Sequence, residues 1–344
     1  MAYTTIDKPT DYFESLIYDG TSGAQSITGL DFTPDWVWLK SRSNAGFQWS
    51  TDSVRGATKT LHQNNANAEG TESGGLTSFN SGGFSIGTNT DINGSSKTFC
   101  SWNWKGGTTA SGTTNGSKPY SYSASPDAGF SVVTYTGNAT AGHLIPHGMG
   151  KVPRLIHIKS RGDDNGWTSG TIASASAWND HGYLHLTNAF GTDANQFGAT
   201  PDATNFRLGT GTGTNGNNGT RVAYCFADVK GYQKINKYVG SGNADGQYIH
   251  LGFKPAFLII KNFASGEGWL MFDNKRLGYN FKNESFYANS NAVEASGSYV
   301  DLLSNGFKAR STNGVINGSG ATYLYHAIAE SPFVNSSGVP NNAR

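Results

Sequence analysis

The sequence predicts an all-β protein built from about three related β-sandwich units. A phrase that runs from a proline to a lysine occurs three times, as FTPDWVWLKSR at 32–42, KVPRLIHIKSR at 151–161 and FKPAFLIIKNF at 253–263. Glycine makes up 46 of 344 residues, and Gly, Asn and Ser separate short aromatic or β-branched runs, which is typical of strands joined by turns. Because no long apolar period of 3.6 residues occurs, no long helix is expected.

The surroundings of the phrase repeat as well. Each copy follows a Tyr-x-Gly opening, at Tyr18, Tyr135 and Tyr238, and precedes a tryptophan, at Trp49, Trp167 and Trp269. Each unit then closes on an aromatic strand, which lies at 97–104, 221–227 and 322–328. The copies are separated by roughly a hundred residues, which is the size of a domain. We therefore expect sandwich units at 1–106, 128–231 and 232–330.

Two segments lie outside these units. Residues 107–127 contain almost no aliphatic side chain and many Gly, Ser and Thr, so they are predicted to be a linker between units one and two. Residues 331–344 form a polar C-terminal tail that either docks on a neighbour or frays.

The repeated strand has two different faces, because side chains alternate along a strand. One face is aliphatic in every copy, as in Val37 and Leu39, and is predicted to be the core of each sandwich. The other face is mixed and supplies the candidate binding or interface residues, together with the arginine that follows the first copy: Trp36, Trp38, Lys40, Arg42, His157, Lys159, Phe257 and Lys261.

The mixed face has two possible functions. It can form a second packed layer or a contact between units, with the lysine stems lying on aromatic rings. Alternatively, it can form an open aromatic surface that stacks on a sugar. The alternation of residues does not distinguish these alternatives.

No catalytic or metal-binding motif is found, and we predict a protein that is not an enzyme and has no cofactor or metal. A pair of carboxylates for glycoside hydrolysis is not excluded, because the distance between two such side chains depends on the tertiary structure. His143 and His147 would need a third metal ligand, and Asp163 and Asp164 have no predictable placement. The glycine-rich stretch 209–219 is expected to be a long hairpin loop.

The two cysteines, Cys100 and Cys225, are predicted to stand at equivalent positions in two closing strands, with His326 at the third, and are expected to be buried free thiols. A net charge of +1 without a basic run argues against nucleic acid as a partner. The N-terminus lacks the pattern of a signal peptide, and no segment is suited to membrane insertion.

Several segments resemble a repeated module of virion-associated proteins of bacteriophages, especially marine ones. The resemblance rests on FTPDWVWLKSR, TDSVRGATKTL at 51–61, FCSWNWKGG at 99–107 and the ending AIAESPFVNSSGVPNNAR at 327–344. It is weaker in unit two, where 169–180 has no counterpart of the Asp-x-Val-Arg-Gly segment. The resemblance implies a jelly-roll or concanavalin-like sandwich and a virion protein of a tail, tail fibre or surface appendage.

The resemblance also implies partners: a homo-oligomer with other virion proteins, and a host-surface carbohydrate or protein. Two alternatives remain. One is a purely structural tail or capsid-decoration protein without host contact, and the other is a glycan-degrading enzyme on the same sandwich.

Overall fold

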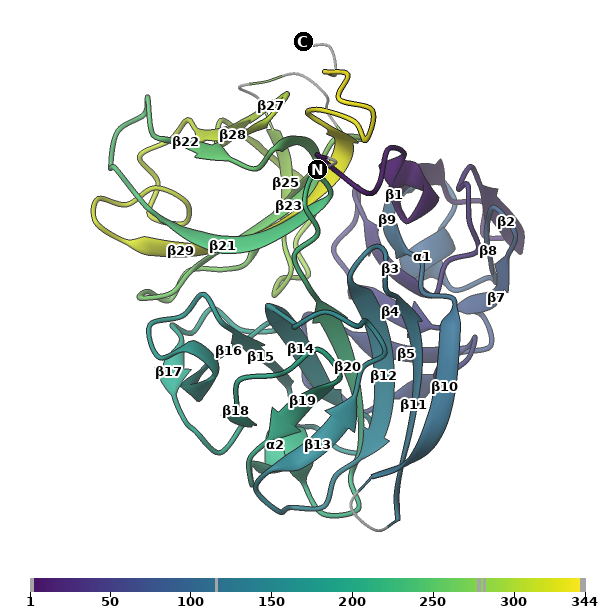
Figure 1. Cartoon of the computed structure of the whole chain (residues 1–344). Coiled ribbons are helices and arrows are strands. Elements are labelled where there is room, and N and C mark those ends of the chain that lie inside the picture. Colours follow the sequence, from purple (N-terminus) through teal and green to yellow (C-terminus); the bar gives the residue numbers. More distant parts are fainter. Residues whose placement is uncertain (1–2, 115–116, 277–279, 281–282, 341–344) are drawn as a thin grey trace.

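The computed structural model describes residues 3–340 except 115–116, 277–279 and 281–282, and it confirms the all-β sandwich fold (Figure 1). Three units follow one another along the chain, and each pairs one large antiparallel sheet with a three-stranded sheet. We call them unit one (strands β1 to β9), unit two (β10 to β20) and unit three (β21 to β29).

Unit one begins with the short 3-10 helix η1 (Pro9–Asp11) and contains one helical turn, α1 (Thr90–Asn93). Its large sheet has the order β1 (Phe13–Asp19), β9 (Thr98–Trp104), β3 (Trp36–Ser41), β4 (Trp49–Asp52), β5 (Lys59–His62) and β6 (Gly70–Thr71). Its small sheet has the order β2 (Gln25–Thr28), β8 (Gly83–Ile86) and β7 (Leu76–Asn80).

Unit two has an eight-stranded sheet and two short helices, η2 (Ala177–Asn179) and α2 (Thr212–Asn215). The large sheet runs β10 (Thr108–Thr114), β11 (Lys118–Ser125), β12 (Phe130–Thr136), β20 (Thr220–Phe226), β14 (Leu155–Ser160), β15 (Trp167–Thr171), β16 (Asp180–Tyr183) and β17 (Gly191–Thr192). The small sheet runs β13 (His143–Pro146), β19 (Asn205–Leu208) and β18 (Phe197–Ala199).

Unit three repeats the topology of unit one. Its large sheet runs β21 (Gln233–Val239), β29 (Thr322–Pro332), β23 (Phe253–Asn262), β24 (Leu270–Asp273), β25 (Asn283–Tyr287) and β26 (Ala295–Gly297). Its small sheet runs β22 (Tyr248–His250), β28 (Gly306–Ala309) and β27 (Val300–Leu303).

The predicted linker is wrong. Residues 108–114 and 118–125 form β10 and β11, which pair with each other, and β11 pairs with β12. The hairpin therefore extends the large sheet of unit two by two strands that have no counterpart among the described residues of units one and three. Repeated Thr, Ser and Tyr are as compatible with a strand at the edge of a sheet as with a flexible segment, so composition alone did not distinguish a hairpin from a linker.

Two smaller expectations also change. The stretch 209–219 connects β19 to β20, which lie in different sheets, and contains α2, so it is not a hairpin loop. The described part of the polar tail docks on the chain itself: the Phe333 amide donates to the Gly252 carbonyl, and Ser336 contacts Asp7 near the N-terminus. Among the described residues, no helix has the length and apolar character needed to cross a membrane.

In every unit the repeated strand pairs with the closing strand, and the register aligns the three units. Lys40 lies opposite Cys100, Lys159 opposite Val222, and Lys261 opposite Leu324. The proposed equivalence of the two cysteines is therefore wrong, since Cys225 lies opposite Ile156 and takes the place of Asn103. Both thiols are free and buried, as expected, but they lie on opposite faces of their sheets.

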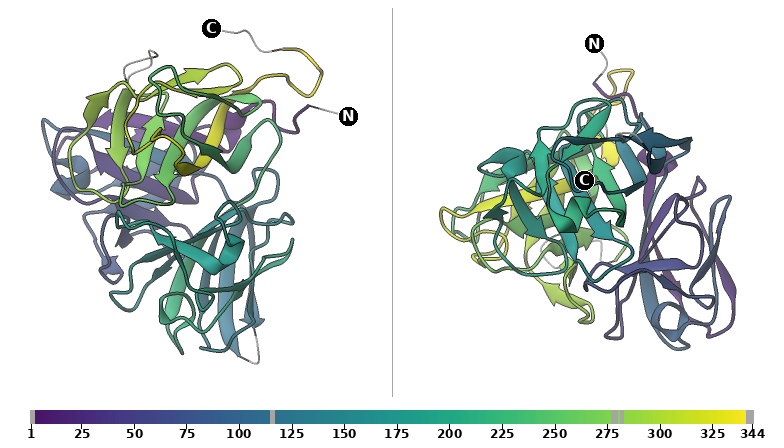
Figure 2. Two further views of the ribbon diagram at one scale, coloured as in Figure 1. Left: turned by 90° about the vertical axis from the view of Figure 1, so that its left-hand side faces the viewer. Right: turned by 90° about the horizontal axis from the view of Figure 1, so that it is seen from below.

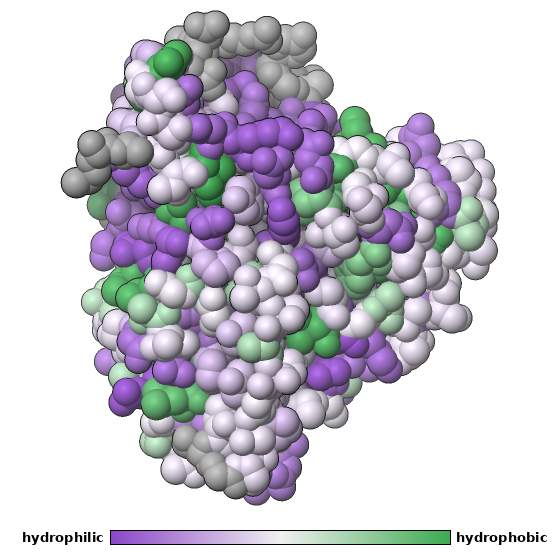
Figure 3. Space-filling view, turned by 45° about the vertical axis from the view of Figure 1, so that its right-hand side comes forward, coloured by the Kyte–Doolittle hydropathy of each residue, from purple (hydrophilic) through white to green (hydrophobic). Residues whose placement is uncertain are grey.

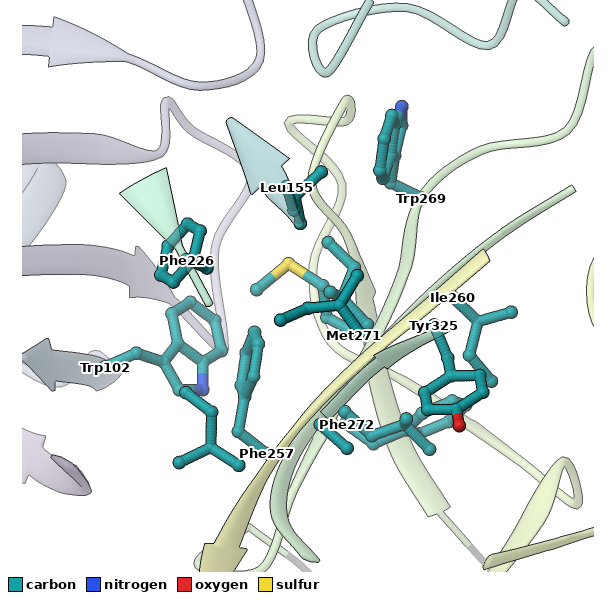
Figure 4. Close-up of a cluster of buried hydrophobic side chains, with 14 of the residues drawn as sticks. Trp102, Leu155, Phe226, Phe257, Ile260, Trp269, Met271, Phe272 and Tyr325 are labelled. Atoms are coloured by element: carbon teal, nitrogen blue, oxygen red, sulfur yellow. The ribbon is translucent and has the colours of Figure 1, made fainter. Parts of the chain in front are cut away.

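In units one and two, the packing separates the two faces of the repeated strand, whereas in unit three Leu258 and Ile260 of the aliphatic face share one cluster with Phe257 of the mixed face. Val37 and Leu39 lie in the sandwich core of unit one, and Ile156 and Ile158 lie in that of unit two. The mixed faces turn away from these cores and enter one large apolar cluster that draws residues from all three units. Figure 4 shows Trp102, Phe226 and Phe257, each from a different unit, pointing toward one another in this cluster.

The three large sheets thus meet in a shared centre, and the small sheets lie outside it (Figures 1 and 2). On the face shown in Figure 3, apolar residues lie in small separate groups rather than in one continuous patch. Most of the large aromatic side chains are buried in the interior.

Candidate functional site

The sequence-predicted site residues lie at the contacts between the three units. Seven of the eight are almost fully buried, and the remaining residue, Arg42, is partly buried: the seven are Trp36, Trp38, Lys40, His157, Lys159, Phe257 and Lys261. Trp36 and Trp38 are only 2% and 3% exposed, so neither ring offers a free face to a sugar. The structure places these side chains in packing within the chain.

Aromatic rings join the units pairwise at the shared centre. Trp36 of unit one stacks on Tyr224 of unit two, with ring centroids 4.2 Å apart. Phe226 of unit two lies 4.6 Å from His326 of unit three. Trp104 of unit one meets Phe257 of unit three edge to face at 5.8 Å. Each unit therefore touches both others, and the units close into a ring.

A hydrogen bond from each unit to its neighbour repeats around this ring. The indole N–H of Trp167 donates to the His62 carbonyl, and that of Trp269 donates to the Tyr183 carbonyl. Gln48 takes the same position in unit one and donates through Nε2 to the Tyr287 carbonyl. Trp49, one residue later, instead lies in the core of its own unit. The chain therefore has an internal pseudo-threefold arrangement.

The three repeated lysines end against backbone carbonyls. Lys40 donates to the carbonyls of Gly46 and Asn291. Lys261 donates to the carbonyls of Thr187 and Glu267, among others. Lys159 donates to three carbonyls of its own unit. Desolvation lowers the pKa of each ammonium group to about 8. Asn291 and Thr187 belong to neighbouring units, so two of these lysines also bind across a contact.

The contact between units one and two, the first junction, holds a buried ion network. Arg55 pairs with Asp52 of the same unit and with Glu69 at 3.1 Å. Tyr224 of unit two donates its hydroxyl to Asp52, and Arg161 of unit two pairs with Glu69 at 2.9 Å. Burial lowers the pKa of Arg55 and is the largest single influence on it, but Asp52, Tyr224 and Glu69 together outweigh burial, and the pKa is raised.

The contact between units three and one, the second junction, repeats the same network. Arg276 pairs with Asp273 at 2.6 Å and with Glu294 at 3.1 Å. From unit one, the Trp102 indole donates to Asp273, and Arg42 pairs with Glu294 at 2.8 Å. The arginine is again fully buried and supplied by an Asp-x-x-Arg segment.

The contact between units two and three, the third junction, has none of these charges at the equivalent positions. Thr171 replaces the aspartate, as the sheet register shows, and Ser174, three residues later, replaces the central arginine. Phe190 and Phe263 replace the glutamate and the second arginine, and their rings meet edge to face at 4.8 Å. At all three junctions the backbone N–H of the first residue of this pair donates to the carbonyl of the second at 2.9 Å. The backbone contact is therefore kept while its side chains are exchanged.

Two buried histidines accompany the shared centre. His326 occupies the position of Tyr224 and Trp102, but it hydrogen-bonds Gln233 rather than a carboxylate. His157 hydrogen-bonds the Ser169 hydroxyl. Desolvation lowers the pKa of both imidazoles to about 3, so both are neutral at neutral pH.

The histidines that flank Pro146 have protein partners. His143 hydrogen-bonds Thr114 and Asn215, and His147 hydrogen-bonds the Asp202 carbonyl. Within the described part of the chain, no cluster of three or more His, Cys, Asp or Glu side chains is arranged to hold a metal ion.

The chain belongs to the family described as Domain of unknown function (DUF7483), which matches residues 8–332. The match spans all three units, in keeping with their shared centre. Searches against curated proteins and against solved structures gave no match.

Sequence reasoning found one side of each junction and missed the other. The mixed face was identified from its alternation, whereas Asp52, Arg55, Glu69 and their counterparts in unit three were not singled out. The available signal was the Asp-x-Val-Arg-Gly segment and its absence from unit two. That absence marks the junction where the ion network is missing.

Proposed function

We propose that this protein is a structural or adhesion component of a bacteriophage particle, in a tail, a tail fibre or a surface appendage. The sequence resemblance supplies the virion context. The observation that carries the proposal is the ring of three sandwiches around one shared core, which makes the chain a single rigid building block. Strands and loops outside that core are then free to differ without altering the frame.

Rigidity follows from how the junctions are built. Opening either ionic junction would expose a fully buried arginine together with its two carboxylates, and would break the hydrogen bond and the ion pair that the neighbouring unit supplies. Opening the centre would expose stacked tryptophans. A component that transmits force or positions a receptor-binding loop needs such resistance to hinge motion between its units.

Within this proposal the chain assembles with copies of itself and with other virion proteins, and its outer loops contact a host-surface glycan or protein. The eight predicted site residues serve the internal frame. Host contact, if the particle uses this chain for it, falls to residues outside the shared centre.

The proposal is tested on purified particles of a phage that encodes this sequence. We expect the chain in particles banded on a density gradient, at a fixed copy number by quantitative mass spectrometry, and gold-labelled antibody on the tail or an appendage. Presence of the chain in infected cells but not in banded particles would overturn the proposal. Preincubating host cells with the purified protein should slow adsorption several-fold for an adhesin and leave it unchanged for a component that is purely structural.

A further inference from the structure

The third junction contains a cavity of about 290 Å³ at the position where the other two junctions hold their ion networks. Unit two contributes Ala173, Ser174, Ala175, Asp180 and Phe190, and unit three contributes Lys237, Phe263, Ala264 and Thr322. Ala173, Ser174 and Asp180 are buried, whereas Ala175, Lys237 and Ala264 are exposed. The cavity is therefore closed at the base and open to solvent at its rim.

The pseudo-threefold arrangement explains why space remains there. Ser174, Phe190 and Phe263 occupy the positions that Arg55, Glu69 and Arg161 fill at the first junction. Serine is much smaller than arginine, and the two phenylalanine rings meet edge to face. Since protein interiors are normally close-packed, the smaller side chains at this junction leave space that the arginine and its partners fill at the first junction.

The walls combine two kinds of groups. Phe190 and Phe263 offer apolar ring surface, and Phe190 is backed by Trp269 at 5.9 Å. Asp180 and Lys237, two residues of opposite charge, also line the cavity. Asp180 is held in place because Ser176 and Thr192 donate to its two oxygens. Aromatic surface beside fixed hydrogen-bonding groups matches a ligand that has apolar C–H faces and a rim of hydroxyls.

We propose that this cavity binds one neutral pyranose residue of a glycan. The sugar ring lies against Phe190 and Phe263, and its hydroxyls meet Asp180 and Lys237. A free anion such as phosphate is disfavoured by the Asp180 carboxylate, and a hydrocarbon by both charges. This inference rests on the proposed function, because it names the class of host molecule that an adhesion component would contact.

The test uses the full chain and a panel of methyl pyranosides of glucose, galactose, mannose and N-acetylglucosamine. We expect saturation-transfer NMR signals for at least one of them, with millimolar affinity. Ala173→Val inserts the residue that unit one carries at this place, Val54, into the cavity wall, and should weaken binding by about tenfold or more. Lys237→Ala at the exposed rim should weaken it by several-fold without affecting folding, whereas Lys8→Ala, an exposed lysine elsewhere, should not change it.

Three outcomes would overturn the proposal. Either no pyranoside gives a signal, or wild type and both cavity variants bind equally well. The third is that benzene, and no pyranoside, displaces the bound sugar from the wild-type protein. The result is separable from the virion assignment. If the chain binds sugar but is absent from banded particles, the proposed function is refuted and the cavity assignment is kept. If the chain is present in banded particles but binds no sugar, the cavity assignment is refuted and the proposed function is kept.

Discussion

The first and third junctions solve the same packing problem with different chemistry. At the first, Arg55 and Arg161 share Glu69 across the contact. At the third, Phe190 and Phe263 occupy the glutamate and outer-arginine positions and meet ring to ring. The same backbone hydrogen bond closes both. The comparison shows that the main chain and the central aromatic cluster fix the arrangement of the three units. The side chains at a junction can differ, provided that the residues facing each other change as a group.

Matched exchange has a physical reason. A buried ion pair and a well-packed apolar pair of similar size contribute comparable net stability, whereas half of an ion pair is strongly unfavourable. A glutamate facing a phenylalanine would leave a carboxylate without its cation. In keeping with this, all four positions of the third junction differ from those of the two ionic junctions.

The largest expected effect comes from breaking an ionic junction on one side. Arg276→Met should lower the free energy of unfolding by about 3–5 kcal/mol, because Asp273 and Glu294 would keep buried charges without their shared cation. Urea denaturation followed by tryptophan fluorescence measures this. Ser174→Ala, at the equivalent position of the third junction, is the matched control and should cost about 1 kcal/mol. Similar losses in the two variants would contradict the comparison.

A second experiment converts one junction into the other. Glu69→Phe and Arg161→Phe should each destabilise the protein, and the double variant should be more stable than the sum of the two predicts, by about 1–3 kcal/mol. The reason is that the double change replaces the outer ion pair by the aromatic pair of the third junction, while Arg55 keeps its pairing with Asp52. Strict additivity in the double-mutant cycle would show that the pairs are not interchangeable.

Acid should act most clearly at the third junction, where His326 replaces the tyrosine and tryptophan of the other two. Its folded pKa of about 3 lies below the unfolded value of about 6.5, so its stabilising contribution is complete above that value and is lost as the pH falls toward 3. At pH 5 this single group should cost about 2 kcal/mol.

Urea midpoints at pH 7.5 and pH 5 measure the effect, and His326→Gln should reduce the difference between them. His157, which also has a lowered pKa of about 3, adds acid sensitivity that remains in this variant. An unchanged pH dependence in the variant would refute the assignment to His326.

The smallest expected effect concerns the two cysteines. Cys100 faces the shared centre, and the equivalent residue of unit two is Val222. Cys100→Val should therefore change the free energy of unfolding by less than about 1.5 kcal/mol. Cys225→Asn makes the opposite exchange, with the residue that unit one carries at Asn103, and should cost more because an amide enters an apolar core. Thermal unfolding of both variants, compared with wild type, measures the contrast, and equal effects would contradict the register.

Much of the fold was accessible from local pattern. Strand alternation identified the aliphatic faces of β3, β14 and β23, and repetition of the proline-to-lysine phrase gave three units. The linker at 107–127 failed because short polar residues suit an edge hairpin as well as a flexible segment. The equivalence of Cys100 and Cys225 failed because the closing strands carry similar aromatic residues in a shifted register, and a slip of an odd number of residues moves a side chain to the other face.

The candidate site was predictable only in part. The mixed face was visible, but its alternatives, packing or sugar surface, depended on what covers it. The partners of Trp36 and Arg42 are Tyr224 and Glu294, which lie far away in the chain. No local period reports such a pairing.

The sequence by itself therefore determined the strands, the repeat and which side of each strand is apolar, because these depend on side-chain alternation and on turn residues within a few positions. Tertiary structure decided that the three units close into a ring, that two junctions are ionic, and that the third is aromatic and open. Those outcomes depend on which distant residues meet and on the volume they fill. Three copies of one strand can thus keep their faces and still enclose three different interiors.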